Sequence, residues 1–219
     1  MTMQADQSFG IFLTIEGIEG VGKTTAVKFI QKYLTQIKLA FVITREPGGT
    51  GVAEQIRQIL LTPNSAETIT PDAELLLMFA SRAQHLQHFI KPNLESGKAV
   101  ISDRFVDASY AYQGGGRQID KARIETLEQW ILGEVRPHAT ILLDAPPALG
   151  LARAKHRGPH DRIEQEKIDF FERVRAAYLV RAEEDPKRFH VLDATQSLVA
   201  VHAQIKAVLD KLFGYQGEK

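Results

Sequence analysis

The segment Gly17–Thr24, with the sequence GIEGVGKT, constrains this chain more than any other stretch. An apolar run, Phe9–Ile15, precedes it, and a stretch with helical spacing follows it. The glycines let backbone N–H groups surround phosphate oxygens, Lys23 reaches the outer phosphates, and Thr24 supplies a hydroxyl for Mg²⁺. A glycine-rich turn with a chance lysine is the alternative, but the full match between a strand and a helix favours a triphosphate site.

Glu19 is unusual in such a loop, because a carboxylate repels phosphate. Two interpretations stay open. The side chain either points into solvent as a hydrated charge, or it faces a second ligand that carries hydroxyl groups.

Composition limits the class of protein and its partners. The 219 residues suit one domain, 1–219, with a small lid and with frayed ends at 1–8 and 214–219. Lysine plus arginine and aspartate plus glutamate both number 27, so bulk charge does not attract nucleic acid or an anionic membrane. The sequence has no cysteine, no signal-peptide pattern and no apolar run near the roughly 20 residues that span a bilayer. These features predict a soluble cytoplasmic protein that binds small molecules.

Five short apolar runs alternate with longer helical patterns, which predicts an α/β fold with a parallel sheet and helices on both faces. The predicted strands are Phe9–Glu16, Leu39–Thr44, Ala99–Ser102, Thr140–Asp144 and Phe189–Leu192. The predicted helices cover about 22–36, 71–96, 120–132, 163–184 and 198–213, and Pro92 is expected to bend or end the second. Ligands of such sheets bind at the carboxyl ends of the strands.

Three further predictions concern the helices and their connections. His85 and His88 have no carboxylate pattern nearby, so we expect surface residues and not a metal site. Tyr110–Gly116 ends in three glycines, which favours a loop or a helix end. Trp130 is expected in the core or at an interface.

Arginines follow two of the predicted strands. A guanidinium group pairs well with phosphate, so Arg45 is interpreted as an anion-binding residue, with a surface arginine in a Pro-Gly turn as the alternative. Asp103 and Arg104 follow the third strand, where the acid can hold Mg²⁺ and the arginine can bind phosphate. A local ion pair between them is the alternative.

Phe79 and Arg82 lie three residues apart on one helix face. Together they can present a ring and a guanidinium group to a planar ligand. Helical aromatic residues are more often core, so the core interpretation is favoured for Phe79 from the pattern alone.

A basic segment follows the fourth strand. Arg153, Lys155, His156, Arg157 and Arg162 fall within ten residues, and Gly158-Pro159 interrupts them. A solvated basic helix end is the ordinary interpretation. Phosphoryl transfer, however, needs positive groups that close over the transferred phosphate, so residues 153–166 are interpreted as a lid.

Five motifs together resemble the thymidylate kinase family in its bacterial form. They are Gly17–Thr24, Thr44–Thr50 (TREPGGT), Asp103–Phe105, Tyr112–Arg117 and Asp161–Glu164, and the resemblance covers nearly the whole chain. It implies a P-loop nucleoside monophosphate kinase fold and a homodimer. It also implies transfer of the γ-phosphoryl group of ATP to dTMP, giving dTDP.

The resemblance implies a role for each matching residue. ATP would be held by Gly17, Ile18, Glu19, Gly20, Val21, Gly22, Lys23 and Thr24, and Mg²⁺ by Thr24 and Asp103. The implied catalytic residues are Lys23, Glu19 and three lid arginines, Arg157 first and then Arg153 and Arg162. The implied dTMP site comprises Glu19, which would recognise the sugar 3′-hydroxyl, with Arg45, Phe79, Arg82, Arg104, Ser109, Tyr112 and Gln113.

The chain departs from the family pattern at one point. Many relatives separate the phenylalanine that stacks on thymine from the arginine that reads its edge by four residues. Here Phe79 and Arg82 are three apart, and Met78 takes the other position. 

A kinase of another deoxynucleotide or of a free deoxynucleoside is an alternative, although Arg45 and Arg104 favour a phosphorylated acceptor. A nucleotide-dependent switch is a more distant alternative, because the sequence has no Asn-Lys-x-Asp motif that would read guanine.

Overall fold

The chain folds around a five-stranded parallel sheet with the strand order β2-β3-β1-β4-β5. The structure is a computed structural model, and it describes residues 10–63, 67–154 and 161–214. The strands are β1 (Phe12–Glu16), β2 (Phe41–Arg45), β3 (Ala99–Asp103), β4 (Ala139–Asp144) and β5 (Phe189–Asp193). All five predicted strands are confirmed, with small shifts at their ends.

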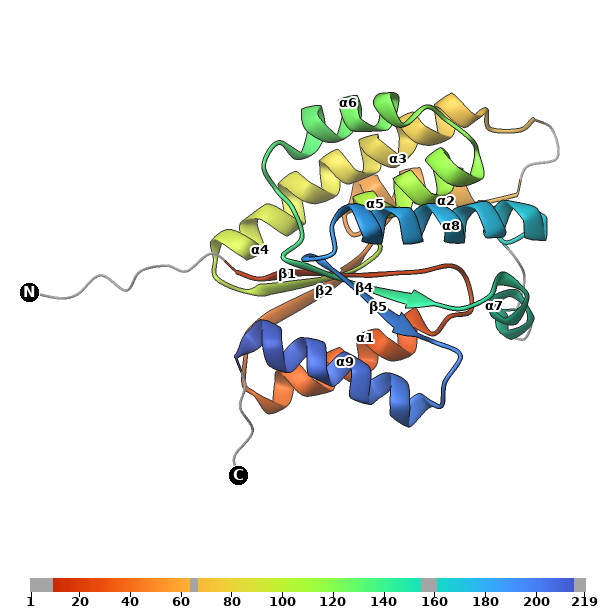
Figure 1. Ribbon diagram of the computed structural model, residues 1–219. Coiled ribbons are helices and arrows are strands. Elements are labelled where there is room, and N and C mark those ends of the chain that lie inside the picture. Colours follow the sequence, from red (N-terminus) through yellow and green to blue (C-terminus); the bar gives the residue numbers. More distant parts are fainter. Residues whose placement is uncertain (1–9, 64–66, 155–160, 215–219) are drawn as a thin grey trace, which may run out of the picture.

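Helices cover both faces of the sheet (Figure 1). One face carries α1 (Lys23–Gln36) and α9 (Leu198–Phe213). The opposite face carries α2 (Gly51–Leu61), α3 (Pro71–His85), α4 (Lys91–Glu95), α5 (Val106–Ser109), α6 (Lys121–Leu132) and α8 (Ile168–Glu184). The short helix α7 (Pro147–Ala154) follows β4. Because both faces are covered, every residue of β1 is buried, which explains why the strands read as continuous apolar runs.

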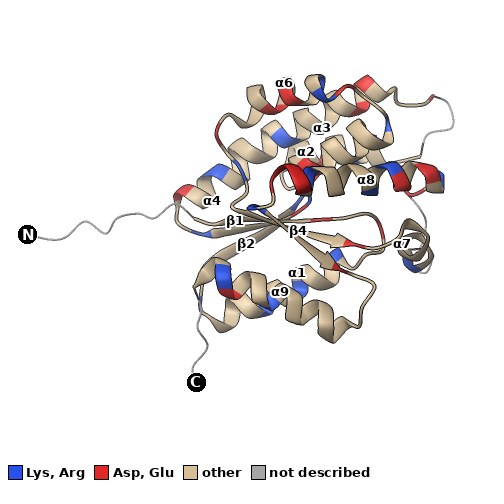
Figure 2. Cartoon of the chain, viewed as in Figure 1, with Lys and Arg blue, Asp and Glu red and all other residues tan. Residues whose placement is uncertain are grey.

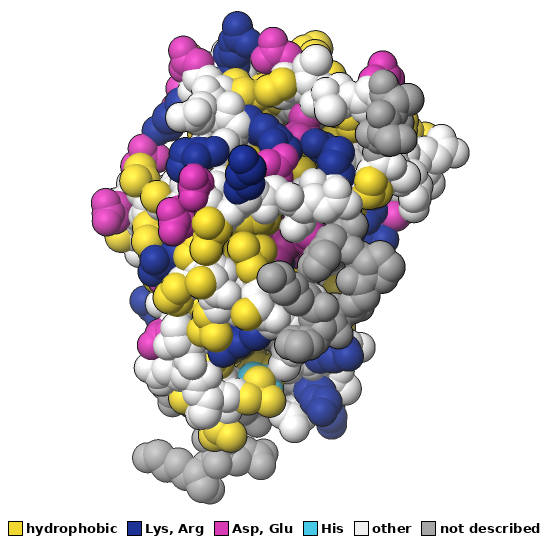
Figure 3. Space-filling model, turned by 90° about the vertical axis from the view of Figure 1, so that its right-hand side faces the viewer, with side chains coloured by type: hydrophobic (Ala, Val, Ile, Leu, Met, Phe, Trp, Pro, Cys, Tyr) yellow, Lys and Arg dark blue, Asp and Glu magenta, His cyan; other side chains and the backbone are white. Residues whose placement is uncertain are grey.

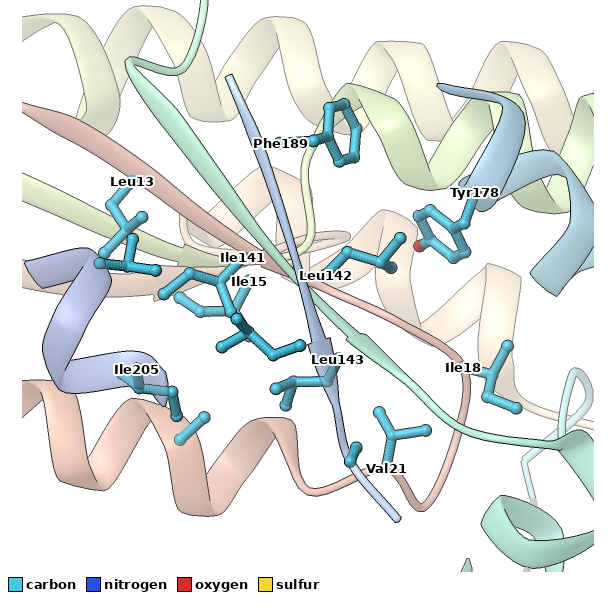
Figure 4. Close-up of a cluster of buried hydrophobic side chains, with 14 of the residues drawn as sticks. Leu13, Ile15, Ile18, Val21, Ile141, Leu142, Leu143, Tyr178, Phe189 and Ile205 are labelled. Carbon is cyan, nitrogen blue, oxygen red and sulfur yellow. The ribbon is translucent and has the colours of Figure 1, made fainter. Parts of the chain in front are cut away.

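The core is built from alternating strand side chains. Figure 4 shows Leu13 and Ile141 on the side of the sheet that faces Ile205 of α9, while Leu142 lies toward Tyr178 of α8. This alternation follows from the two-residue period of a strand, which directs successive side chains to opposite faces. Charged residues of both signs are spread over the outer helices and the strand ends (Figure 2), in keeping with the balanced composition.

The predicted helix 71–96 is continuous but not uniform. A π-helical turn, η1 (Leu86–Ile90), separates α3 from α4. Pro92 does not end the helix at once: it lies just after the π-helical turn, and α4 continues to Glu95.

Of the two predictions for Tyr110–Gly116, the loop is wrong and the helix end is confirmed. This segment forms a π-helix, η2, that continues α5 and ends at Gly116. Its glycines are needed for close packing against α8: a Cβ at Gly115 would lie 2.6 Å from the Cβ of Ala177, and one at Gly116 would lie 2.4 Å from the ring of Phe170. Tertiary packing here outweighs the poor intrinsic helix propensity of glycine.

Other boundaries differ from the predictions as well. Helix α2 was not predicted, and α8 begins at Ile168 rather than at 163. Trp130 is 77% exposed, so it is not a core residue, and an interface role stays a prediction. Among the described helices, none has the length and hydropathy needed to cross a membrane.

Candidate functional site

A cavity of about 200 Å³ lies at the carboxyl ends of β1, β2 and β3. Seen from the side of the strand ends, the surface carries acidic and basic side chains in close proximity (Figure 3). Most of the predicted site residues line this cavity: Glu19, Gly20, Gly22, Lys23, Thr24, Arg45, Arg82, Asp103, Arg104, Ser109, Tyr112 and Gln113. The topology of the sheet therefore gathers segments that lie far apart in the sequence.

The phosphate loop leads from β1 into α1. Nζ of Lys23 donates hydrogen bonds to the carbonyl oxygens of Gly17 (3.0 Å) and Ile18 (2.8 Å). Desolvation of the ammonium group and the nearby charge of Arg104 lower the pKa of Lys23 to about 8. Ile18 and Val21 direct their side chains into the core and contribute only backbone to the loop surface.

Glu19 does not point into solvent. Its carboxylate accepts a 2.8 Å bond from Nη2 of Arg104, and the hydroxyl of Tyr112 lies 2.8 Å from both of its oxygens. The side chain is 11% exposed and lines the cavity. The interpretation of Glu19 as a hydrated charge is therefore wrong, and Arg104 offsets the repulsion between this acid and a phosphate.

Arg104 joins the phosphate loop to the opposite wall of the cavity. Its backbone is left-handed (φ 72°), and its amide donates to the carbonyl of Ile15. The guanidinium group also donates to the carbonyl of Gly17 (2.9 Å) and lies 4.7 Å from the centre of the Tyr112 ring. Its ion pair is with Glu19 rather than with the neighbouring Asp103.

A second arginine accompanies Arg45 at the mouth of the cavity. Arg45 is half exposed and pairs with both carboxylate oxygens of Glu54 at 3.0 Å. Arg57 of α2 donates to the carbonyl of Pro47 (2.7 Å), and burial together with the charge of Arg45 lowers its pKa. Sequence reasoning missed Arg57 because it missed α2, although Thr50, whose side chain caps that helix, was an available signal.

Arg82 forms the inner wall of the cavity and is 2% exposed. Its Nε donates to Glu46 (2.7 Å), Nη1 to the hydroxyl of Ser109 (3.0 Å) and Nη2 to the carbonyl of Phe105 (3.1 Å). Two of its five N–H groups are left for a ligand after these bonds. The arginine is thus fixed before any ligand arrives.

The prediction that His85 lies on the surface is wrong, whereas His88 is exposed as predicted. The ring of His85 is completely buried, 2.9 Å from Glu46 through Nδ1 and 2.6 Å from the hydroxyl of Thr44 through Nε2. Burial by itself would raise the pKa of Glu46, but Arg82 and His85 outweigh that effect and hold the pKa below its usual range. His85 can be buried because Thr44 of β2 and Glu46, just after β2, are its hydrogen-bonding partners. The helical pattern of the sequence does not reveal these partners.

Phe79 and Met78 occupy different environments. Phe79 is 2% exposed and belongs to the buried cluster between α3 and α6, where its ring lies 4.7 Å from the guanidinium carbon of Arg82. Met78 lines the cavity instead. The core interpretation of Phe79 thus matches its burial.

The two described arginines of the predicted lid, Arg153 and Arg162, have different surroundings. Arg153 is exposed, donates to the carbonyl of Ala194 (3.0 Å), and lines a second cavity of about 220 Å³ together with Gly20, Val21 and Gly22 of the phosphate loop. Arg162 pairs with Glu74 and lines neither cavity. Arg157 lies outside the described residues.

The phosphate loop also touches α7 directly. A Cβ at Gly20 would lie 1.8 Å from the carbonyl oxygen of Gly150, and a Cβ at Gly150 would lie 2.5 Å from the carbonyl oxygen of Glu19. Real Cβ atoms do not approach so closely, so this backbone-to-backbone contact requires glycine at both positions.

Comparisons with known proteins agree with this geometry. The family model described as thymidylate kinase matches residues 15–205. The chain is similar to the thymidylate kinase of Ectopseudomonas mendocina (52% identity, covering 93% of this chain and 96% of the relative) and to that of Hahella chejuensis (52% identity, covering 90% and 94%). The crystal structure of thymidylate kinase from Ehrlichia chaffeensis superposes with a TM-score of 0.73 at 33% identity, covering 92% of this chain and 99% of that structure. A P-loop between β1 and α1, a cavity at the strand ends lined by several arginines and these matches lead to one conclusion: the chain belongs to the thymidylate kinase family.

Proposed function

We propose that this protein transfers the γ-phosphoryl group of ATP to dTMP, giving dTDP for the supply of dTTP. The observation that carries the proposal is the position of the phosphate loop between two cavities, since Gly20 and Gly22 line both. Lys23 is held by two loop carbonyls, as a triphosphate site requires, and Glu19 faces the first cavity, which also has arginines at its mouth. The names of the relatives, all thymidylate kinases, support the same reaction.

The donor side is assigned to ATP and Mg²⁺. The loop amides and Lys23 would hold the phosphates, and the second cavity, beside Arg153 and Gln196, would take the base. Thr24 and Asp103 line the first cavity and offer the hydroxyl and carboxylate oxygens that Mg²⁺ prefers. The described residues contain no group of three or more acids or histidines, which suits an ion that completes its shell with water and substrate phosphates. When bound, Mg²⁺ would neutralise charge on the phosphates.

The acceptor side is assigned to dTMP. Arg45, Arg57 and Arg104, which line the cavity, are assigned to its phosphate. Glu19 is assigned to the 3′-hydroxyl, and Tyr112 would crowd the 2′ position. For the base we assign Met78 to the face and the remaining N–H groups of Arg82 to the edge, and Ser109 and Gln113 lie nearby. We place Phe79 behind Arg82 as a support rather than against the base.

The transfer would proceed in line and without a covalent enzyme intermediate, because positioning and positive charge are sufficient for phosphoryl transfer. Residues 153–166 are proposed as the lid that supplies this charge. Arg157 is assigned the first role from the sequence motif, and Arg153, at the edge of the donor cavity, the second.

We also propose a cytoplasmic homodimer. Exposed apolar side chains occur on three neighbouring helices of one face: Ile59 (56% exposed) on α2, Leu76 (58%) on α3 and Trp130 (77%) on α6. Such residues suit an interface between copies of the chain. Sedimentation equilibrium of the protein and of Trp130→Glu, which should weaken the dimer, tests this assignment.

A panel of acceptors assayed with Mg·ATP tests the function. We expect dTMP to be turned over with the highest kcat/KM, ahead of dUMP, dCMP and thymidine. Faster turnover of dCMP or of uncharged thymidine than of dTMP would show that the acceptor is wrongly assigned.

A further inference from the structure

Glu74 is a charged residue whose side chain is completely buried, on α3, one turn before Met78. A buried carboxylate is stable only if several donors satisfy it. Its oxygens accept bonds from Nε2 of Gln113 (2.8 Å), Nε of Arg117 (3.2 Å) and Nη2 of Arg162 (2.7 Å). Burial alone would raise the pKa of Glu74, but these bonds hold it below its usual range, so the carboxylate is charged at neutral pH.

The three donors come from segments on opposite sides of the cavity. Gln113, from η2, lines the cavity beside Tyr112. Arg162 belongs to the segment after α7, and its neighbours Asp161 and Ile163 line the cavity from the other side. Glu74 is therefore a common partner of the two walls, which the ion pair between Arg117 and Glu166 (2.6 Å) also joins.

Arg162 is held at three points. Besides the bond to Glu74, its Nε donates to the carbonyl of Leu60 (2.8 Å) and its amide to the carbonyl of Leu61 (3.0 Å), both at the end of α2. Asp161, the preceding residue, accepts hydrogen bonds from the amides of Ile163 and Glu164, which fixes the direction of its carboxylate. The charge of Asp161 acts on Arg57, one of the arginines at the cavity mouth.

We propose that Glu74 is a positioning residue for the acceptor: through Arg162 and Gln113 it sets the separation of the two walls of the dTMP cavity. It does not touch the acceptor itself. The proposal rests on the acceptor assignment made above, and it gives Arg162 a role in fixing the cavity wall rather than in stabilising the transferred phosphoryl group. A fixed pair of walls lowers the entropic cost of binding the acceptor.

The test separates acceptor kinetics from donor kinetics. In Glu74→Gln and Arg162→Met, the KM for dTMP should rise about tenfold while the KM for ATP changes by less than about twofold, since only one side of the loop is disturbed. The double variant should be no worse than Glu74→Gln alone, because Arg162→Met removes one of the three contacts that Glu74→Gln already weakens. The matched control is Asp72→Asn, because Asp72 lies on the same helix as Glu74 and its ion pair with Arg123 of α6 is exposed. This variant should keep both KM values.

Thermal unfolding of each variant is measured in parallel. If Glu74→Gln does not fold, Arg162→Met decides, because it leaves Glu74 bonded to Gln113 and Arg117. Wild-type KM for dTMP in folded variants, or an equal rise in both KM values, would overturn the positioning role. Turnover of dTMP by the wild-type protein checks the proposed function separately, and if another acceptor proves to be the substrate the same comparison is made with that acceptor.

Discussion

The two sides of the phosphate loop are built in opposite ways. On the acceptor side, Arg82, Arg104 and His85 are buried or nearly so, and each is engaged by protein groups. On the proposed donor side, Arg153 is exposed, and the hydrogen bonds of Lys23 within the described chain go to two loop carbonyls. The inner wall of the proposed acceptor site is thus organised before a ligand binds, whereas the proposed donor side keeps its charge available for one.

This difference has a thermodynamic cause. A buried charge needs a partner, and removing that partner leaves an uncompensated ion, so acceptor-side substitutions disturb the fold as well as binding. The exposed Arg153 contributes little to the stability of the unliganded protein. Desolvation lowers the pKa of Lys23, so the unliganded fold does not favour its charged form and loses little stability when that charge is removed. Substitutions on the donor side should therefore change catalysis and leave stability intact, and four predictions test the contrast.

The largest effect is expected for Lys23→Ala. Loss of the charge at the base of the loop should lower kcat about a thousandfold, equivalent to about 4 kcal/mol, because no other group replaces it at the outer phosphates. The midpoint of thermal unfolding should stay within a few degrees of the wild-type value. Steady-state assays and circular dichroism measure the two quantities. A collapse of stability in this variant would erase the distinction between the two sides.

The next effect is expected for Arg82→Met. The substitution leaves Glu46 buried with His85 alone, so the free energy of unfolding should fall by about 3 kcal/mol. The KM for dTMP should rise in addition. Denaturant unfolding measures the loss, with Arg123→Met as the control, since the ion pair of Arg123 with Asp72 is exposed. An unfolding free energy equal to that of the control would contradict the description of the acceptor side as a preformed unit.

A smaller effect concerns pH. The pKa of Lys23 is about 8 in the unliganded protein, and bound phosphate charge must raise it. ATP binding should therefore take up a proton near pH 8, and affinity should fall by up to about tenfold for each pH unit above 8. Titration calorimetry between pH 7 and 9.5 measures this dependence. Lys23→Arg, which stays charged, should lose the pH dependence; if it does not, another group is responsible.

The smallest effect distinguishes Met78 from Phe79. Met78→Ala should raise the KM for dTMP about threefold to tenfold with little change in stability, because the side chain faces the cavity. Phe79→Leu should instead lower the unfolding free energy by about 1–2 kcal/mol, because the ring packs in the core beneath Arg82. The opposite pattern, with the KM for dTMP more sensitive to Phe79, would restore Phe79 as the residue that stacks on the base.

The sheet and the phosphate loop could be predicted because their signals are local. Continuous apolar runs mark strands that are buried on both faces. The phosphate loop is recognised from the spacing of residues within the single segment Gly17–Thr24. The parallel topology then placed Arg45, Asp103 and Arg104 at one edge. These parts of the site needed no information about packing.

The remaining parts depend on partners far away in the sequence. The sequence pattern predicts His85 on the surface, but its partners Glu46 and Thr44 hold it in the interior. It likewise predicts Arg162 as a lid cation, but Arg162 pairs with the buried Glu74. The π-helix at Tyr110–Gly116 depends on contacts with α8 that no local pattern contains. Arg57 was missed with α2, because one capping residue is a weaker signal than a periodic apolar stripe.

The contact between Gly20 and Gly150 has a consequence for mutational tolerance. Neither position accepts any side chain, so the two glycines form a single constraint shared by the phosphate loop and α7. Substitutions at Gly150 should be lost from a library selected for activity as completely as those at Gly20, although Gly150 belongs to no nucleotide-binding motif. A random-mutagenesis map of this chain would thus show Gly150, on α7, to be as intolerant of substitution as Gly20 of the phosphate loop.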